Sequence, residues 1–190
     1  MGHWPDGMSR ESLLQRVGAV DWARTRSDGE DSSYVPDAFR RLIDARTDSE
    51  AETAFRRFDN SVVTQGFLHE AAEKLVPCLL EALSFELSGP ARHQVVELLT
   101  EISLGYTSSA EQAEGNTQLA EACRAAIRQG LDQIYGLLTD TDARVRRAAL
   151  YILNRVELDR PRLAAVAEPL AKSDQDEEVR SLAADQLTTR

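Results

Sequence analysis

Apolar residues recur every three or four positions along most of the chain, which is the period of an amphipathic α-helix. The strongest such stripe runs from Leu68 to Leu83, and the next runs from Val95 to Ile102. No run of alternating apolar and polar residues is long enough to predict a half-buried β-strand. The sequence therefore predicts an all-α fold without any β-sheet.

Capping and turn residues predict where several helices begin and end. Asp48 or Ser49 can cap a helix, because their side chains accept hydrogen bonds from free backbone N–H groups. Gly105 is placed to end the Val95 helix in a left-handed conformation. A polar loop is expected at 106–116, and a helical interruption is expected near Gly130.

Two segments near the C-terminus repeat at a spacing of 34 residues. The corresponding pairs are Asp140 and Asp174, Val145 and Val179, Arg146 and Arg180, and Ala149 and Ala183. A fixed spacing between helical units is typical of stacked helical repeats, in which each unit buries its apolar face against its neighbours. The repeat therefore predicts that these valines and alanines are buried.

The repeated pattern, Asp-x-Asp-x-x-Val-Arg, resembles the turn and second helix of HEAT repeats, and the chain is similar to bacterial HEAT-like proteins with an ARM-type superhelix. This resemblance implies a right-handed α-solenoid of antiparallel helix pairs over residues 35–190. Residues 1–34 are expected to add an N-terminal helix and a polar loop to the same compact domain. In the HEAT family the turn Asp and the helix Arg form a structural ladder between repeats, a role that falls here to Asp140, Arg146, Asp174 and Arg180.

The charge of the chain is negative and unevenly distributed. The net charge is −10, and residues 61–120 carry 2 Lys/Arg against 8 Asp/Glu. An anionic surface repels phosphate backbones and attracts cations. We therefore expect no nucleic-acid partner, and a basic protein is the partner that the charge favours.

Five residues of this acidic region are candidates for partner binding. Glu70 and Glu73 fall on the polar side of one helix, while Glu97 and Glu101 stand four residues apart on the next. Like charges at that spacing cost a few tenths of a kcal/mol, which a purely structural helix has no reason to accept. Tyr106, in the following polar loop, is a candidate interface anchor. The alternative is a solvated acidic face that aids solubility.

Signatures of catalysis and metal binding are absent from the sequence. It has no GxGxxG, P-loop, GxSxG or paired CxxC motif, and His69-Glu70 lacks the second histidine of HExxH. We therefore expect no enzyme activity, no cofactor and no metal. The two cysteines, the lack of a signal-peptide pattern and the lack of a long apolar stretch lead us to expect a cytoplasmic protein without a membrane partner.

These observations favour a non-catalytic protein that binds another protein. Within that class we favour an inhibitor or immunity protein that neutralises a basic toxin, because the negative charge could steer a cationic partner. A general scaffold or regulatory adaptor is the alternative. A HEAT-like DNA glycosylase is the enzyme hypothesis, and it fits less well because such an enzyme needs a basic concave surface.

Overall fold

The structure, a computed structural model, describes residues 9–29 and 31–188, so the first eight residues of the expected N-terminal segment lie outside it. The α-helices of the first part are α1 (Arg10–Ala19), α2 (Val35–Asp44), α3 (Asp48–Asp59), α4 (Glu70–Ala82), α5 (Gly89–Leu104), α6 (Ser109–Ala113) and α7 (Leu119–Arg128). Those of the second part are α8 (Leu131–Gly136), α9 (Ala143–Val156), α10 (Arg160–Ser173) and α11 (Glu177–Thr188). The remaining elements are the strands β1 (Val63–Thr64), β2 (Phe67–Leu68) and β3 (Tyr106–Thr107) and the 3-10 helices η1 (Trp22–Arg24) and η2 (Leu137–Thr139).

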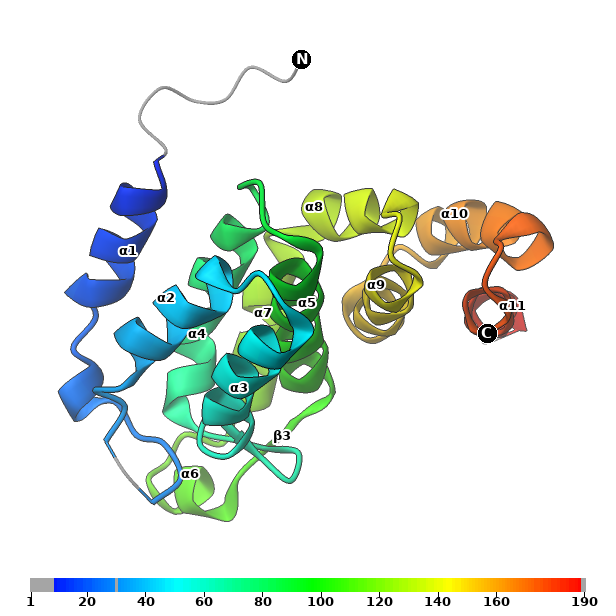
Figure 1. The fold of residues 1–190 in the computed structure, drawn as a ribbon. Coiled ribbons are helices and arrows are strands. Elements are labelled where there is room, and N and C mark those ends of the chain that lie inside the picture. The colour runs from blue at the N-terminus through cyan, green and yellow to red at the C-terminus, as the bar shows by residue number, and fades with distance from the viewer. Residues whose placement is uncertain (1–8, 30, 189–190) are drawn as a thin grey trace.

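The helices form a thick half and a thinner extension (Figure 1). Helices α1 to α7 gather in the thick half, where α5 packs against α2, α3, α4 and α7. Helix α9 packs on the other side of α5, and α10 and α11 continue the extension beyond α9. One hydrophobic core runs through both parts, from Leu13 on α1 to Ala183 on α11. The all-α character expected from the sequence is confirmed.

Of two expected helix boundaries, one is wrong and one is confirmed. Helix α3 is capped by Thr47 and not by Asp48 or Ser49, and Thr47 forms a capping box with Glu50. The interruption near Gly130 is confirmed, since α7 ends at Arg128 and α8 begins at Leu131.

Gly105 ends α5 for a different reason from the one expected. Its φ is −66°, so the expected left-handed conformation is wrong. A Cβ atom at this position would lie 2.6 Å from Cδ2 of Leu68, which is closer than any non-bonded contact allows. Glycine is therefore required by the close approach of the Leu68 side chain from β2 rather than by backbone conformation.

The expectation of a fold without any sheet is wrong, because three two-residue strands pair in the order β1-β2-β3. Strands β1 and β2 form an antiparallel hairpin closed by Gln65 and Gly66, whose φ angles of 52° and 80° are those of a tight hairpin turn. Strand β3 joins β2 in parallel. The expected polar loop at 106–116 therefore contains β3 and α6. Strands of two residues are too short to show alternation in the sequence.

The residues of the 34-residue repeat take equivalent places on α9 and α11. Val145, Ala149, Val179 and Ala183 are all fully buried, as the repeat predicts. Val145 and Ala149 lie on the core side of α9, and Val179 and Ala183 lie on the core side of α11. Helix α9 packs directly against α11.

Arginine side chains join each repeated turn to the next. Arg146 on α9 donates through Nε and Nη2 to both carboxylate oxygens of Asp174, at 2.9 and 2.6 Å, and through Nη1 to the carbonyl of Asp140 at 2.8 Å. Arg180 on α11 donates in the same way to the carbonyl of Asp174, at 2.7 Å. Arg92 on α5 adds a contact that the sequence did not indicate, a 2.7 Å bond to Oδ2 of Asp140.

The pair of Arg146 with Asp174 provides a test of this packing. Its side chains are only 11% and 6% exposed, so removing one partner leaves a charge without compensation in a buried place. We expect Asp174→Ala to lower the free energy of unfolding in urea by about 3 kcal/mol. Asp132→Ala is the matched control, because Asp132 also pairs with an arginine but its side chain is 93% exposed. The control should cost less than about 1 kcal/mol. Equal losses in the two variants would contradict a structural role for the buried pair.

Candidate functional site

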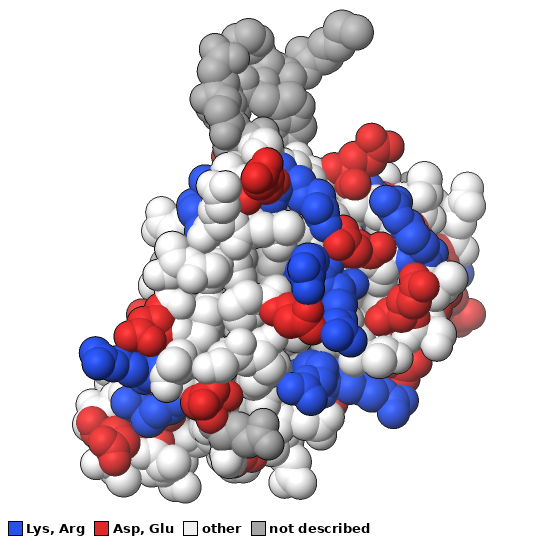
Figure 2. Space-filling model, turned by 60° about the vertical axis from the view of Figure 1, so that its left-hand side comes forward, with Lys and Arg blue, Asp and Glu red and all other residues white. Residues whose placement is uncertain are grey.

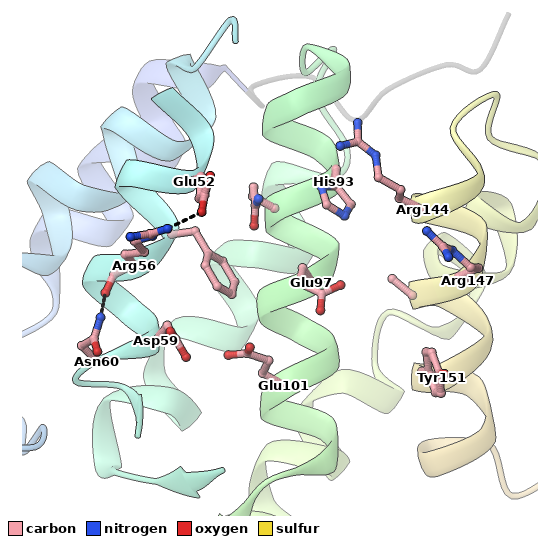
Figure 3. Close-up of a pocket in the computed structure, with 13 residues that line it drawn as sticks. Glu52, Arg56, Asp59, Asn60, His93, Glu97, Glu101, Arg144, Arg147 and Tyr151 are labelled. Carbon is pink, nitrogen blue, oxygen red and sulfur yellow. Dashed lines mark hydrogen bonds and ion pairs between the residues drawn. The ribbon is translucent and has the colours of Figure 1, made fainter. Parts of the chain in front are cut away.

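A groove between α3, α5 and α9 is the candidate functional site (Figure 3). It has a volume of about 810 Å³ and is open to solvent along its length. Helix α5 forms the floor, α3 forms one wall and α9 forms the other. Side chains of both charges line it, together with the phenol ring of Tyr151, which is 44% exposed.

Three carboxylates lie close together in this groove. Glu97 and Glu101 project from successive turns of α5, and Asp59 approaches Glu101 from the end of α3. Within residues 9–29 and 31–188, no group donates a hydrogen bond to any of the three and no cation forms an ion pair with them. The Oε2 atom of Glu101 is buried and has no hydrogen-bond partner. Buried polar atoms are normally hydrogen-bonded, so this unpartnered oxygen is costly to the fold.

The environment shifts the protonation of both glutamates. Burial, together with the neighbouring carboxylates of Asp59 and Glu97, raises the pKa of Glu101 to about 7. Burial also raises the pKa of Glu97, which the charge of Arg147 partly offsets. Desolvation disfavours the charged form of an acid, and like charges nearby have the same effect. Glu101 is therefore in equilibrium between its charged and neutral forms near pH 7.

The arginines on the walls are engaged by other carboxylates. On α3, Arg56 pairs with Glu52 at 2.5 Å. On α9, Arg144 pairs with Asp142 at 2.7 Å, and Arg147 pairs with Glu178. These partners neutralise the cations on the walls.

His93, at one end of the groove, is harder to protonate than an exposed histidine. Burial lowers the pKa of His93, and the neighbouring Arg144 lowers it further. The charge of Arg147 therefore offsets the acidic floor only in part.

The residues expected to bind a partner do not form one continuous surface. Only Glu97 and Glu101 lie in the groove. Glu70 is held by Lys74 at 2.7 Å and Arg26 at 3.3 Å. Glu73 is exposed on α4 outside the groove, and Tyr106 is 65% exposed on β3. Glu97 and Glu101 are half-buried between α3 and α9, a position that the helical period of the sequence does not show.

The sequence argument also missed Glu111, which joins three segments. This side chain is 1% exposed and accepts bonds from Nε and Nη2 of Arg26 at 3.1 and 2.7 Å. It also accepts from the backbone N–H of Glu70 at 3.0 Å and from the side chain of Asn116 at 3.0 Å. Although burial acts to raise the pKa of Glu111, the bonds from Arg26 and Asn116 bring it below the ordinary value. This glutamate therefore serves the fold.

Other surfaces of the molecule offer less specific chemistry. On the face seen in Figure 2, basic and acidic side chains intermingle, and neither sign forms a continuous field. Within the described ranges, no group of three or more His, Cys, Asp or Glu side chains is arranged to hold a metal ion. The helices in these ranges are also too short or too polar to cross a membrane.

The raised pKa of Glu101 predicts how stability depends on pH. The folded protein favours the neutral acid, so this contribution to stability is complete below pH 4.5 and is lost as the pH rises through about 7. Glu101→Gln keeps a neutral side chain at every pH. We expect urea unfolding to find this variant more stable than the parent at pH 8, by on the order of 2 kcal/mol, and nearly equal to it at pH 4.5. Exposed Glu86→Gln is the control. A difference between Glu101→Gln and the parent that did not change with pH would contradict the shift.

Comparison of the chain with family models, with curated proteins and with solved structures gave no match.

Proposed function

We propose that this chain is a non-catalytic binding protein that holds a basic protein in the groove between α3, α5 and α9. The observation that supports this most directly is the convergence of Asp59, Glu97 and Glu101 without a hydrogen-bond or ion-pair partner among the described residues. Side chains that weaken the fold without performing a structural task are typical of functional sites. A cation from a partner would remove this weakness.

The chemistry of this groove suits a basic side chain. An arginine fork can donate to two carboxylate oxygens at once, and burial inside a groove strengthens such bonds relative to open water. The exposed ring of Tyr151 on the α9 wall offers a face on which a guanidinium can stack. Buried arginine and tyrosine contacts are the usual centres of binding energy at protein interfaces.

The charge of the whole molecule supports a macromolecular partner. A net charge of −10 would attract a basic protein over a distance and speed its association. The groove alone takes only a few side chains, so the remaining contacts would come from its rims. We infer that a basic toxin, neutralised in the manner of an immunity protein, is the partner to test first, with a basic regulatory protein as the scaffold or adaptor alternative.

The HEAT-like arrangement remains part of this proposal. The contacts of Arg92 and Arg146 with Asp140 and Asp174 support a stack in which α5, α9 and α11 are equivalent helices of successive units. In a right-handed α-solenoid these second helices would line the concave side. Solenoids commonly use such concave surfaces for binding.

A peptide that carries one arginine tests the proposal. The probe is Ac-Gly-Gly-Gly-Arg-Gly-Gly-Gly-NH2, and its control carries neutral citrulline in place of arginine. We expect amide chemical shifts of residues lining the groove to move with the arginine peptide alone. Binding should be roughly tenfold tighter at pH 8 than at pH 6, because the ionised fraction of Glu101 rises through its pKa of about 7. Glu101→Gln should remove this pH dependence.

A pair of double variants separates the groove from general attraction between opposite charges. Glu97→Gln with Glu101→Gln neutralises the floor, whereas Glu86→Gln with Glu177→Gln makes the same change in net charge at exposed positions. The first pair should abolish binding of the arginine peptide, and the second should leave it nearly unchanged. Equal binding by the two double variants, or equal binding of arginine and citrulline peptides, would overturn the proposal.

A further inference from the structure

We propose that a second groove, between α2 and α3, binds a phosphate monoester, that is, a doubly charged phosphate group carried on a larger molecule. This basic groove is lined by four arginines and lies apart from the acidic groove. Helix α3 contributes Glu52 and Asp59 to the acidic groove, and it contributes Thr53 and Arg57 to the basic groove. The two grooves therefore lie along different faces of α3, and the second site does not depend on the proposed function.

The basic groove follows the turn that joins α2 to α3. The two helices lie side by side and pack against each other (Figure 1). The cavity has a volume of about 520 Å³, which is the size of a typical small-molecule site. The buried side chains of Ala45 and Ala54 give it an apolar lining. It can therefore hold more of a ligand than the phosphate group alone.

The lining of this groove is basic, although the chain as a whole carries a net charge of −10. The charged residues that line it are Arg40, Arg41, Arg46, Arg57, Asp44 and Glu50. Asp44 is paired with Arg10, which approaches from α1. Glu50 turns back to accept hydrogen bonds from the backbone N–H groups of Arg46 and Thr47, at 2.8 and 3.2 Å. The two carboxylates are therefore engaged away from the guanidinium groups of the groove.

Two of the four arginines have no acidic partner. Arg40 and Arg41 both pair with Asp37. Within residues 9–29 and 31–188, neither Arg46 nor Arg57 forms an ion pair with a carboxylate. A phosphate monoester carries a charge of about −1.5 to −2 at pH 7, which matches these two cations. A single carboxylate would balance only one of them.

Contacts within the fold hold both cations in place. The guanidinium of Arg57 lies over the ring of Tyr34, at 4.9 Å from the ring centroid. Such stacking restrains a guanidinium without neutralising its charge. The turn that carries Arg46 is fixed by a hydrogen bond from the hydroxyl of Ser88 to the carbonyl of Ala45, at 2.5 Å. Groups that are held before binding lose less conformational entropy when a ligand arrives.

The charge around the groove favours a small ligand over a long polyanion. An acidic surface repels an extended chain of phosphates or an anionic membrane. At physiological ionic strength, charges more than about 8 Å away are largely screened, so a single phosphate in the groove would interact mainly with its arginines. Arginine forks donate to phosphate oxygens in pairs, which makes them well suited to this group. The ligand is therefore one phosphate, on a small ester or on a phosphorylated side chain.

Phenyl phosphate tests this inference by NMR titration of the full chain at pH 7.5. Phenyl sulfate is the control, because it has a similar shape and only one negative charge. We expect phenyl phosphate to move amide signals of the basic groove with a dissociation constant on the order of 1 mM, and phenyl sulfate to bind roughly fivefold more weakly. At pH 5, phenyl phosphate should also bind more weakly, because phosphate takes up its second proton with a pKa of about 6. Binding of phenyl sulfate should change little.

A peptide distinguishes the two sources of the phosphate. The peptide carries one central phosphoserine with three glycines on each side. Tighter binding of the peptide than of phenyl phosphate would identify a phosphorylated protein as the source, and the reverse order would identify a small ester. Either order supports a phosphate site.

Variants of the protein then assign the binding to the two unpaired arginines. Arg46→Gln and Arg57→Gln should each weaken the binding of phenyl phosphate roughly fivefold. Arg155→Gln is the matched control, because Arg155 is also exposed and without an ion pair among the described residues, but it lies outside the groove. The control should bind phenyl phosphate as the parent does. Melting temperatures equal to that of the parent would show that the substitutions leave the fold intact.

Three results would overturn the inference. They are equal affinity for phenyl phosphate and phenyl sulfate, equal weakening by Arg46→Gln and Arg155→Gln, and movement of amide signals only outside the basic groove. The arginine peptide of the proposed function should bind to Arg46→Gln as it does to the parent. Failure of the phosphate site would therefore leave the acidic groove unaffected, and failure of the acidic groove would leave the phosphate site unaffected.

Discussion

The arrangement of the molecule depends on the burial of α5. This helix contacts α2, α3, α4, α7 and α9, and its apolar residues Val95, Val96, Leu98, Leu99 and Ile102 are fully buried. Burying side chains of this size contributes about 1.5–3 kcal/mol each, so α5 fixes the positions of the helices around it. Since α3 and α9 pack on either side of it, the remaining face of α5 becomes the floor of the groove.

The acidic floor of the groove also departs from the general rule that buried polar groups are paired. Elsewhere the buried acids are satisfied, as Glu111 is by Arg26 and Asp174 is by Arg146. Glu97 and Glu101 have no such partner among the described residues, although arginines stand on both walls. Those arginines are held by Glu52, Asp142 and Glu178, and the charge of Arg147 offsets the floor only in part. The contrast between paired and unpaired acids within one structure distinguishes the groove from the rest of the polar surface.

The sequence predicted what depends on periodicity and could not predict what depends on distant contacts. The helical period and the 34-residue repeat correctly placed Val145 and Val179 in the core. The same period could not show that α3 and α9 would enclose Glu97 and Glu101, because their burial comes from segments about forty to fifty residues away along the chain. Glu111 was missed for the same reason, since its partner Arg26 is 85 residues away.

The arginine contacts determine which parts of the chain can change in length. Each arginine holds a carbonyl of its own turn, and Arg92 and Arg146 also hold the aspartate of the next turn. Each such contact requires the helix that carries the arginine and the turn that carries the aspartate. It does not require a fixed number of residues between the two. The interval from Arg146 to Arg180 is 34 residues, whereas the interval from Arg92 to Arg146 is longer and contains β3, α6 and α7. The segments between these arginines can therefore differ in length while the contacts that join the turns are kept.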